Sequence, residues 1–168
     1  MTVKLSNPKV ETRPAQPYLA IRLQAPHTQF PEVIPASIDD VFAYMQQQGI
    51  ESDGPPLMRY HVIDMAGVMD VAIGWPVASA VLGAGRIIAD TLPAGDYATL
   101  VYTGVENGIA GNGVLIDWAQ AQGLQWDRWD DPKGDAFAGR VEFFLSGPED
   151  DPDPANWDTE VAIKVKGA

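Results

Sequence analysis

A near-repeat within the sequence constrains its fold more than any other feature. The motif DVAI occupies residues 70–73 and the motif EVAI occupies residues 160–163. Each closes a segment of about the same length that carries the same order of structural signals. Such self-similarity is the signature of a duplicated unit. We therefore expect a single domain over residues 1–168, built from two repeats over about 8–78 and 84–166.

Each repeat contains one helix-like stretch, at residues 37–49 and 113–123. Ser37 is a suitable N-cap for the first helix, with Asp40 at the third position of a capping box. Both stretches stop at a glycine, Gly49 or Gly123, as a left-handed C-cap requires. The apolar stripes that we expect to be buried include Val41, Phe42, Met45, Leu115 and Trp118.

Strand-like stretches surround these helices, so that each repeat has the order β-α-β-β. They lie at residues 17–25, 56–64 and 69–77 in the first repeat and at 93–104, 139–147 and 159–166 in the second, with a further strand at 83–91. The sequence therefore predicts an α+β fold with about eight mainly antiparallel strands. Both helices should cover one face of the sheet, and the other face should carry a ligand groove.

The stretch from Arg140 to Leu145 contains a glutamate between bulky apolar residues. Because side chains alternate across a strand, Val141, Phe143 and Leu145 should share one face. That face is entirely apolar, so we expect it to pack under the helices. Arg140, Glu142 and Phe144 should then face the open groove. A carboxylate in mid-strand needs a partner or water, so an exposed ion pair with Arg140 is as good an interpretation as a binding site.

Aromatic residues could complete such a groove. In the frame of the repeat, Met58 corresponds to Glu142 and Tyr60 corresponds to Phe144. Tryptophans in loops often line pockets, which draws attention to Trp126 and Trp129 in the stretch LQWDRWDD. An aromatic box with one carboxylate suits a flat, apolar and often cationic ligand. For each aromatic residue taken singly, ordinary packing remains the more common role.

Composition excludes several other classes of protein. The formal net charge is −12, and residues 127–160 supply −8 of it, with eleven Asp and Glu against three Lys and Arg. This charge disfavours nucleic-acid binding, although solubility alone explains most of it. There is no cysteine and no signal-like or membrane-spanning apolar run, so we expect a cytoplasmic protein. With only His27 and His61, we expect neither a metal nor another cofactor.

Several motifs, spread over about residues 8–166, resemble the GyrI-like small-molecule-binding domain, which also serves as the effector domain of AraC-type and MerR-type multidrug regulators. They are the turn and strand Pro93-Ala94-Gly95-Asp96-Tyr97-Ala98 with Tyr102 and Gly104, the helix Leu115-Ile116-Asp117-Trp118 that ends at Gly123-Leu124, Glu142-Phe143-Phe144, and Trp157-Asp158-Thr159-Glu160.

The resemblance implies that Glu142 sits in a groove between the repeats and meets lipophilic cations. It also implies that Tyr97 or Tyr102 contributes to this groove, with Trp75, Trp126 or Trp129 in its walls. Members of the family commonly have a tyrosine where this chain has Phe144, so this groove lacks one hydroxyl group.

Three functions follow from these observations. The first is a stand-alone module that binds a small hydrophobic, often cationic, organic molecule. The second is a hydrolase of electrophilic, cyclopropane-type compounds, in which Glu142 is the general base. The third, implied by acidic members of the family, is an inhibitor of DNA gyrase. Binding is the favoured interpretation, and inhibition of gyrase is the least favoured.

Overall fold

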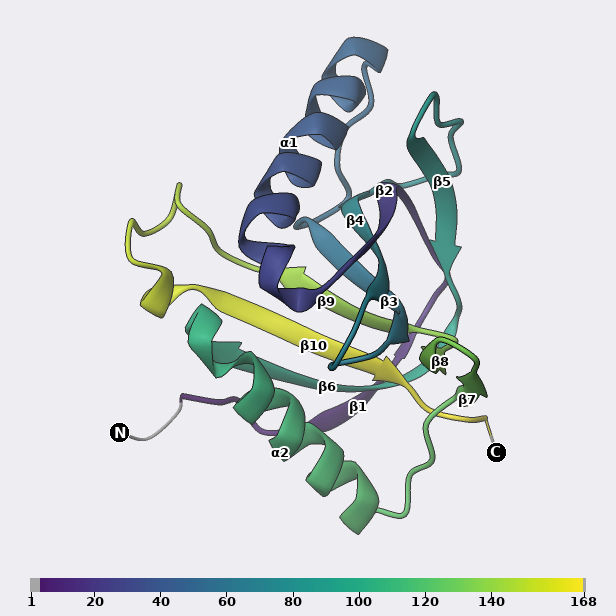
Figure 1. The fold of residues 1–168 in the computed structure, drawn as a ribbon, viewed down its shortest axis with the longest axis vertical. Helices are drawn as coiled ribbons and strands as arrows, with labels where there is room; N and C mark the ends of the chain where they lie inside the picture. The colour runs from purple at the N-terminus through teal and green to yellow at the C-terminus, as the bar shows by residue number, and fades with distance from the viewer. Residues whose placement is uncertain (1–3, 168) are drawn as a thin grey trace.

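The computed structural model describes residues 4–167 as a strongly curved antiparallel sheet with two long helices (Figure 1). The helices are α1 (Phe30–Gln48) and α2 (Gly108–Ala121). The strands are β1 (Lys9–Arg13), β2 (Gln16–Ala25), β3 (Leu57–Ile63), β4 (Met69–Pro76), β5 (Ile87–Leu92), β6 (Gly95–Thr103), β7 (Arg128–Asp131), β8 (Gly134–Phe137), β9 (Arg140–Phe144) and β10 (Asp158–Lys164). Three short 3-10 helices complete the fold, at His27–Gln29, Val105–Asn107 and Pro154–Asn156.

The order of strands across the sheet is symmetrical about its centre. The order is β1-β6-β10-β9-β3-β4-β2-β5, and β9 pairs with β3 at the midpoint. The N-terminal strand β1 pairs with β6, whereas β5, which opens the second half of the chain, pairs with β2. Each half of the chain therefore contributes an edge strand that pairs with a strand of the other half. The hairpin β7–β8 lies off this order and pairs with β3 through β8.

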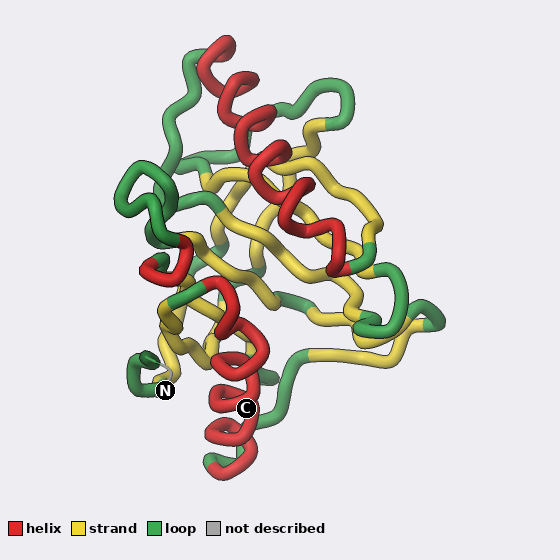
Figure 2. The backbone as a smooth tube through the Cα atoms, turned by 60° about the vertical axis from the view of Figure 1, so that its left-hand side comes forward, coloured by secondary structure: helices red, strands yellow, loops and turns green. Residues whose placement is uncertain are grey.

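The predicted α+β class, with both helices on one face of the sheet, is confirmed (Figure 2). The sheet has ten strands rather than about eight, because β1 and the hairpin β7–β8 are too polar to be recognised from hydrophobic alternation. Both helices also begin earlier than predicted. Pro31 suits the first turn of α1, and Ser37 is a buried residue inside that helix rather than its N-cap.

The predicted helix ends are correct. Gly49 has a φ of 68° and follows α1 directly, and Gly123 has a φ of 73° just after α2. In each case a backbone N–H beyond the helix donates to a carbonyl of its last turn, from Ile50 to Met45 and from Leu124 to Ala119. Glycine adopts this left-handed conformation without steric cost, so it terminates the helix while satisfying its free carbonyl groups.

The strand parity in β9 is correct, but the assignment of its two faces to the helices and to the groove is wrong. Val141 lies in a core cluster with Tyr18, Leu92 and Tyr97, which come from opposite ends of the strand order, and Phe143 packs against that cluster. The sheet therefore curls until the face without helices closes on itself, which we call the concave face. Both faces consequently carry an apolar core, and apolar side chains alone do not identify the helix face.

Glu142 instead lies on the face that carries the helices. Directly paired residues share a face of a sheet, and one such row crosses six of the ten strands. The row consists of Leu100, Val161, Glu142, Met58, Ile73 and Ile21. Leu100 and Val161 contact α2 residue Leu115 in one core cluster. Every other member of this row is apolar.

The predicted core of the helices is partly confirmed. Val41, Met45 and Leu115 are buried, and Trp118 is partly buried in the cluster under α2. Phe42 is 40% exposed, and Leu145, which lies just beyond β9, is 45% exposed. Phe42 lies at the edge of the apolar stripe of α1, where its ring packs against that of Trp75 with the two ring centroids 5.3 Å apart.

Two glycines in α2 allow a test of how this helix is seated. A Cβ at Gly111 would lie 2.9 Å from Cδ1 of Tyr102, whereas a Cβ at Gly113 would meet nothing within 4 Å. We expect Gly111→Ala to destabilise the protein by about 1–3 kcal/mol, because the contact forces α2 away from the sheet. Gly113→Ala should stabilise it by about 0.5–1 kcal/mol, since alanine favours helix. Denaturant unfolding measures both, and equal effects would contradict the close contact.

Candidate functional site

The candidate site is built around the carboxylate of Glu142, at the centre of the sheet. Tyr60 donates a hydrogen bond from Oη to Oε1 of Glu142 at 3.2 Å, and Tyr102 donates one from Oη to Oε2 at 3.3 Å. Tyr60 lies on β3 in the first half of the chain and Tyr102 lies on β6 in the second half. Each half of the chain therefore contributes one tyrosine hydroxyl, and each hydroxyl donates to a different oxygen of the same carboxylate.

Burial is the main influence on the ionisation of these groups. It raises the pKa of Glu142, against the hydrogen bond from Tyr60 and the attraction of Arg140, which lower that pKa. Burial also raises the pKa of Tyr60 and of Tyr102, and the nearby charge of Glu142 raises both further. The two hydroxyl groups therefore stay protonated near neutral pH and act as hydrogen-bond donors.

Arg140 is the nearest cation in the sequence, but it is held away from Glu142. Its Nη2 donates to Oδ1 of Asn112 on α2 at 2.8 Å, and its guanidinium lies 4.8 Å from the centroid of the Phe137 ring. Within residues 4–167, no Lys or Arg nitrogen lies within 4.0 Å of the Glu142 carboxylate. The hydrogen-bond partners of this partly exposed carboxylate are thus neutral hydroxyl groups.

Apolar side chains surround the carboxylate on the side of α1. Met58, Tyr60 and Phe144 belong to one cluster with the first turns of that helix. The ring of Phe30 packs edge-on against Tyr60, with centroids 6.4 Å apart. On the other side, Tyr102 lies against Gly111 of α2. We call Met58, Tyr60, Tyr102, Glu142 and Phe144 the glutamate cluster; it lies between the two helices on the helix face of the sheet.

The other four predicted site residues lie elsewhere. Tyr97 is on the concave face, where its hydroxyl donates to the carbonyl of Pro93 at 2.7 Å. Trp75 lies under α1 and donates from Nε1 to the Ile38 carbonyl at 3.0 Å. Trp126 lies near the end of α2, beside a cavity of about 380 Å³. Trp129 is on β7 and is 52% exposed.

Sequence reasoning missed two residues next to the glutamate cluster, Phe30 and Asn112. Asn112 anchors Arg140, but the stretch Gly111-Asn112-Gly113 reads as a turn because glycine is uncommon inside helices. Phe30 lies before the predicted start of α1. The absence of a hydroxyl at Phe144 leaves the glutamate with both of its hydrogen bonds, since Tyr60 and Tyr102 supply them.

The described part of the chain offers no group of three or more His, Asp or Glu side chains that could hold a metal ion. It also has no helix long and apolar enough to cross a lipid bilayer. The chemistry available at the glutamate cluster is therefore that of one desolvated carboxylate, two phenols and their apolar surroundings. Such a site can neutralise a cation or accept a proton.

The two halves of the chain thus share one sheet, and one half-buried carboxylate lies between two helices on its helix face, which defines an α+β domain with a candidate ligand site at its centre. A family model for the GyrI-like small molecule binding domain matches residues 6–166. The chain belongs to this family. Among curated proteins, none matches it.

Solved structures with the same fold have low sequence identity to this chain. The C-terminal domain of EcmrR superimposes with a TM-score of 0.76 at 19% identity, covering 100% of both chains. In the complex of EcmrR with DNA the match covers 96% of this chain and 58% of that one, with a TM-score of 0.75 at 18% identity. This chain therefore spans little more than half the length of that regulator.

Two further structures carry descriptions of a ligand or an activity. SAV2435, bound to tetraphenylphosphonium, has a TM-score of 0.59 at 12% identity and matches over 96% of this chain and 95% of its own. A hydrolase from Listeria innocua has a TM-score of 0.64 at 14% identity, over 95% and 91% of the two chains. At these identities the likeness establishes the fold.

Replacing Glu142 by glutamine should increase stability at neutral pH. A carboxyl whose pKa is raised by folding contributes stability below its unfolded pKa, and this contribution is lost as the pH rises through the folded pKa. Above the folded pKa the ionised carboxylate lowers the free energy of unfolding, whereas a neutral glutamine does not. We expect Glu142→Gln to raise the melting temperature at pH 7, with a difference that shrinks as the pH falls below about 4.5, the ordinary value.

Glu160→Gln is the matched control, because Glu160 accepts a hydrogen bond from the Arg13 guanidinium at 2.7 Å. Loss of the Glu160 carboxylate, and with it this ion pair, should lower the melting temperature at pH 7. Scanning calorimetry at several pH values separates the two. If Glu142→Gln destabilises the protein at pH 7 as Glu160→Gln does, Glu142 has a cationic partner after all.

Proposed function

We propose that this protein binds a small lipophilic cation between α1 and α2, with Glu142 as the counter-charge. The observation that carries the proposal is a desolvated carboxylate whose two hydrogen-bond partners are neutral phenols, with Arg140 held by Asn112 and Phe137. A buried charge is costly unless an opposite charge compensates it. A lipophilic cation supplies that charge, and the surrounding aromatic rings favour it further.

The same geometry explains why the molecule should be apolar as well as cationic. Met58, Phe144 and Phe30 surround Tyr60 in one apolar cluster, and glycine-rich α2 covers the opposite side. A small hydrated ion would lose its water there without replacement, whereas an aromatic cation buries apolar surface. Membership of the GyrI-like family supports binding of a small molecule, and the binding of tetraphenylphosphonium by SAV2435 supports this class of ligand.

Tetraphenylphosphonium is therefore the first probe, with neutral triphenylphosphine oxide as its uncharged counterpart. We expect Glu142→Gln to weaken binding of the cation about tenfold or more, because it removes the counter-charge while keeping the size of the side chain. Affinity for the neutral oxide should change less than about twofold. Isothermal titration calorimetry measures both ligands on both proteins.

Glu160→Gln controls for the overall change in charge, since it removes one carboxylate from the concave face. It should leave the affinity for tetraphenylphosphonium within about twofold of the original. An equal loss in both variants would mean that net charge attracts the cation and that Glu142 has no special part in binding.

Hydrolysis is the second candidate, because the pKa of Glu142 is raised toward the range that suits a general base. The similarity to a hydrolase from Listeria innocua supports testing it. The substrate would be an electrophilic, cyclopropane-type compound, and Glu142 would take a proton from the attacking water. We expect Glu142→Gln to abolish turnover of a neutral substrate while its binding persists. Binding without turnover in the unchanged protein would exclude this candidate.

A further inference from the structure

Two opposite charges are neighbours on β9 without forming an ion pair. Arg140 and Glu142 are two residues apart in the strand, so their side chains share one face of the sheet and start about 7 Å apart along it. Within residues 4–167, neither of them has an oppositely charged group within 4.0 Å. An arginine side chain is long enough to reach a carboxylate at this spacing. Other contacts must therefore hold the two groups apart.

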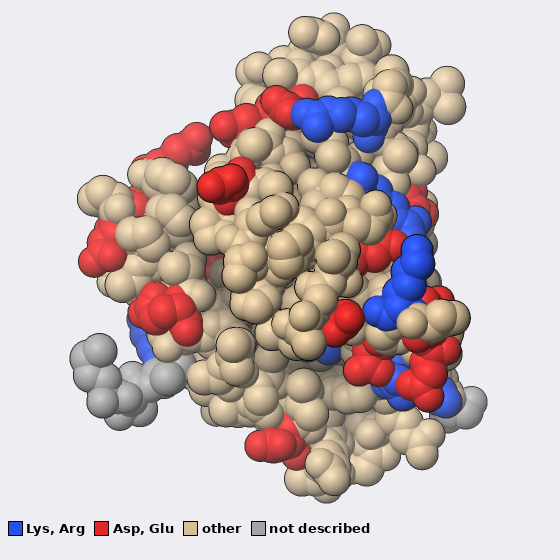
Figure 3. Space-filling view, in the orientation of Figure 1, with Lys and Arg blue, Asp and Glu red and all other residues tan. Residues whose placement is uncertain are grey.

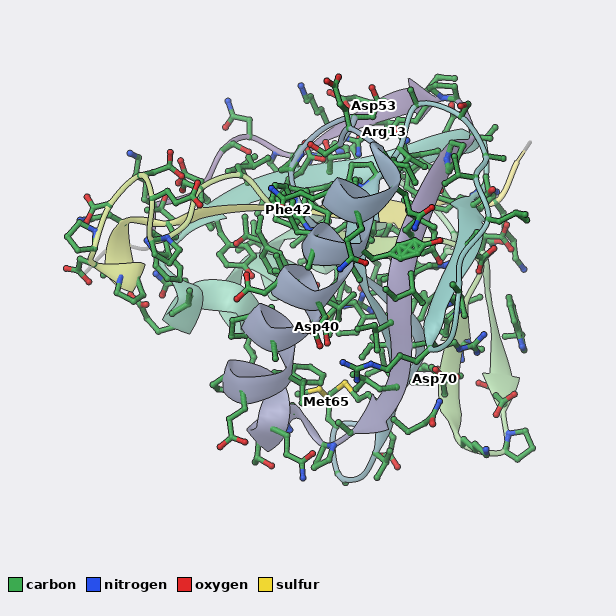
Figure 4. The ribbon with its side chains drawn as sticks, turned by 90° about the horizontal axis from the view of Figure 1, so that it is seen from above. Arg13, Asp40, Phe42, Asp53, Met65 and Asp70 are labelled. Carbon is green, nitrogen blue, oxygen red and sulfur yellow. The ribbon has the colours of Figure 1, made fainter. Side chains whose placement is uncertain are left out.

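Arg140 is the exception among the six arginines of this chain. Each of the other five has a carboxylate oxygen within 4.0 Å of its guanidinium. Figure 4 labels Asp70, the partner of Arg22, on the side of β2 away from α1. Figure 3 shows the Lys and Arg side chains of its view mainly along one edge, over β5, β7 and β8. Among the described residues, Arg140 is thus the cation whose attraction acts on Glu142.

The side-chain amide of Asn112 on α2 holds the guanidinium of Arg140. Its Oδ1 accepts a hydrogen bond from Nη2 of Arg140 at 2.8 Å, and its Nδ2 donates to the Gly108 carbonyl oxygen, also at 2.8 Å. The same amide acts on Glu142, whose pKa is raised by burial and lowered, among smaller influences, by Asn112. Because Nδ2 is engaged with the helix backbone, Oδ1 is fixed toward the guanidinium.

The ring of Phe137 on β8 supports the guanidinium from a second direction. Its centroid lies 4.8 Å from Cζ of Arg140. A planar guanidinium stacks favourably on an aromatic face. Phe137 is 6% exposed and belongs to the core cluster under α2, so the ring itself is held in place. Asn112 and Phe137 together keep Arg140 at a distance from which its charge acts on Glu142 without contact.

A cation held at this distance keeps Glu142 ionised without neutralising it. Burial raises the pKa of Glu142, and the attraction of Arg140 opposes that effect. A direct ion pair would favour the ionised form more strongly, but it would also occupy the carboxylate that an external cation needs. A ligand would then have to break that pair before it could bind. Separation of the two charges therefore suits a site for an external cation.

We propose that Asn112 is a positioning residue that sets the charge selectivity of this site, by keeping Arg140 from forming an ion pair with Glu142. The inference rests on the proposed binding of a lipophilic cation at Glu142. Without the amide, Arg140 loses its hydrogen bond to α2, and the neighbouring carboxylate on β9 becomes its strongest acceptor. The site then loses its preference for a cation over a neutral molecule of similar shape.

Asn112→Ala tests this proposal, because alanine favours helix and offers the guanidinium no acceptor. We expect the change to weaken binding of tetraphenylphosphonium about tenfold or more, and to alter the affinity for neutral triphenylphosphine oxide less than about twofold. In an Arg140→Met background, Asn112→Ala should change the affinity for the cation less than about twofold, since no guanidinium remains to be released. Isothermal titration calorimetry measures all four proteins.

Asn107→Ala is the matched control. Nδ2 of Asn107 donates to the Thr103 carbonyl, four residues earlier, at 2.8 Å. Asn112 makes the same kind of bond to Gly108, but in the described chain only Asn112 also holds Arg140. Asn107→Ala should keep the affinity for the cation within about twofold. An equal loss in both variants, or a loss that persists in the Arg140→Met background, would mean that Asn112 merely supports the helix, and the proposal is then overturned.

Thermal melting at pH 7 tests the same contact without a ligand. Glu142→Gln should raise the melting temperature of the original protein but lower that of the Asn112→Ala variant, because in the variant it removes one partner of an ion pair. If the sign reverses and the unchanged protein does not bind tetraphenylphosphonium, the proposed function fails and the role of Asn112 in holding Arg140 stands. If the sign does not reverse, this inference is overturned, whether or not the cation binds.

Discussion

The central constraint on this structure is one carboxylate held in a row of side chains that is otherwise apolar. Glu142 occupies the middle of a row that contains Leu100, Val161 and Met58, and two phenols from different halves of the chain hold it there. A leucine at this position would avoid the cost of desolvating a charge. We therefore expect the glutamate to make the protein less stable at neutral pH than an apolar residue at the same position would. Such a cost is characteristic of functional sites, where stability is exchanged for affinity toward a ligand.

The position of this carboxylate follows from the symmetrical order of the strands. Strands β9 and β3 meet at the centre, so corresponding positions of the two halves, Glu142 and Met58, become direct neighbours. The exchange of edge strands β1 and β5 ties the halves together around this pair. A symmetrical scaffold presents two equivalent positions at its centre, and only one of them carries the charge. An asymmetric ligand can then have its cationic part on one side and its apolar part on the other.

Much of this arrangement could be predicted from the sequence, because alternation and glycine positions report local conformation directly. The parity of β9 and the grouping of Glu142 with Phe144 came from alternation, and their grouping with Met58 and Tyr60 came from the frame of the repeat. Alternation could not show which face of β9 the helices cover, since Val141 and Phe143 are as apolar as residues under a helix. What covers a face depends on how far the sheet curls, and that is decided by contacts between strands distant in sequence, such as Tyr18 with Tyr97. Alternation also does not indicate which aromatic residues lie near Glu142, and Trp75, Tyr97, Trp126 and Trp129 lie elsewhere in the fold.

Strand β3 connects the chemistry of the two faces. Met58 and Tyr60 reach the glutamate cluster, and between and beyond them Arg59 and His61 reach the concave face. The bulge at His61 loosens the regular pairing with β4 at the point where these two sets of side chains meet. A ligand that shifts Tyr60 must therefore act on the same few peptide units that position Arg59 and His61.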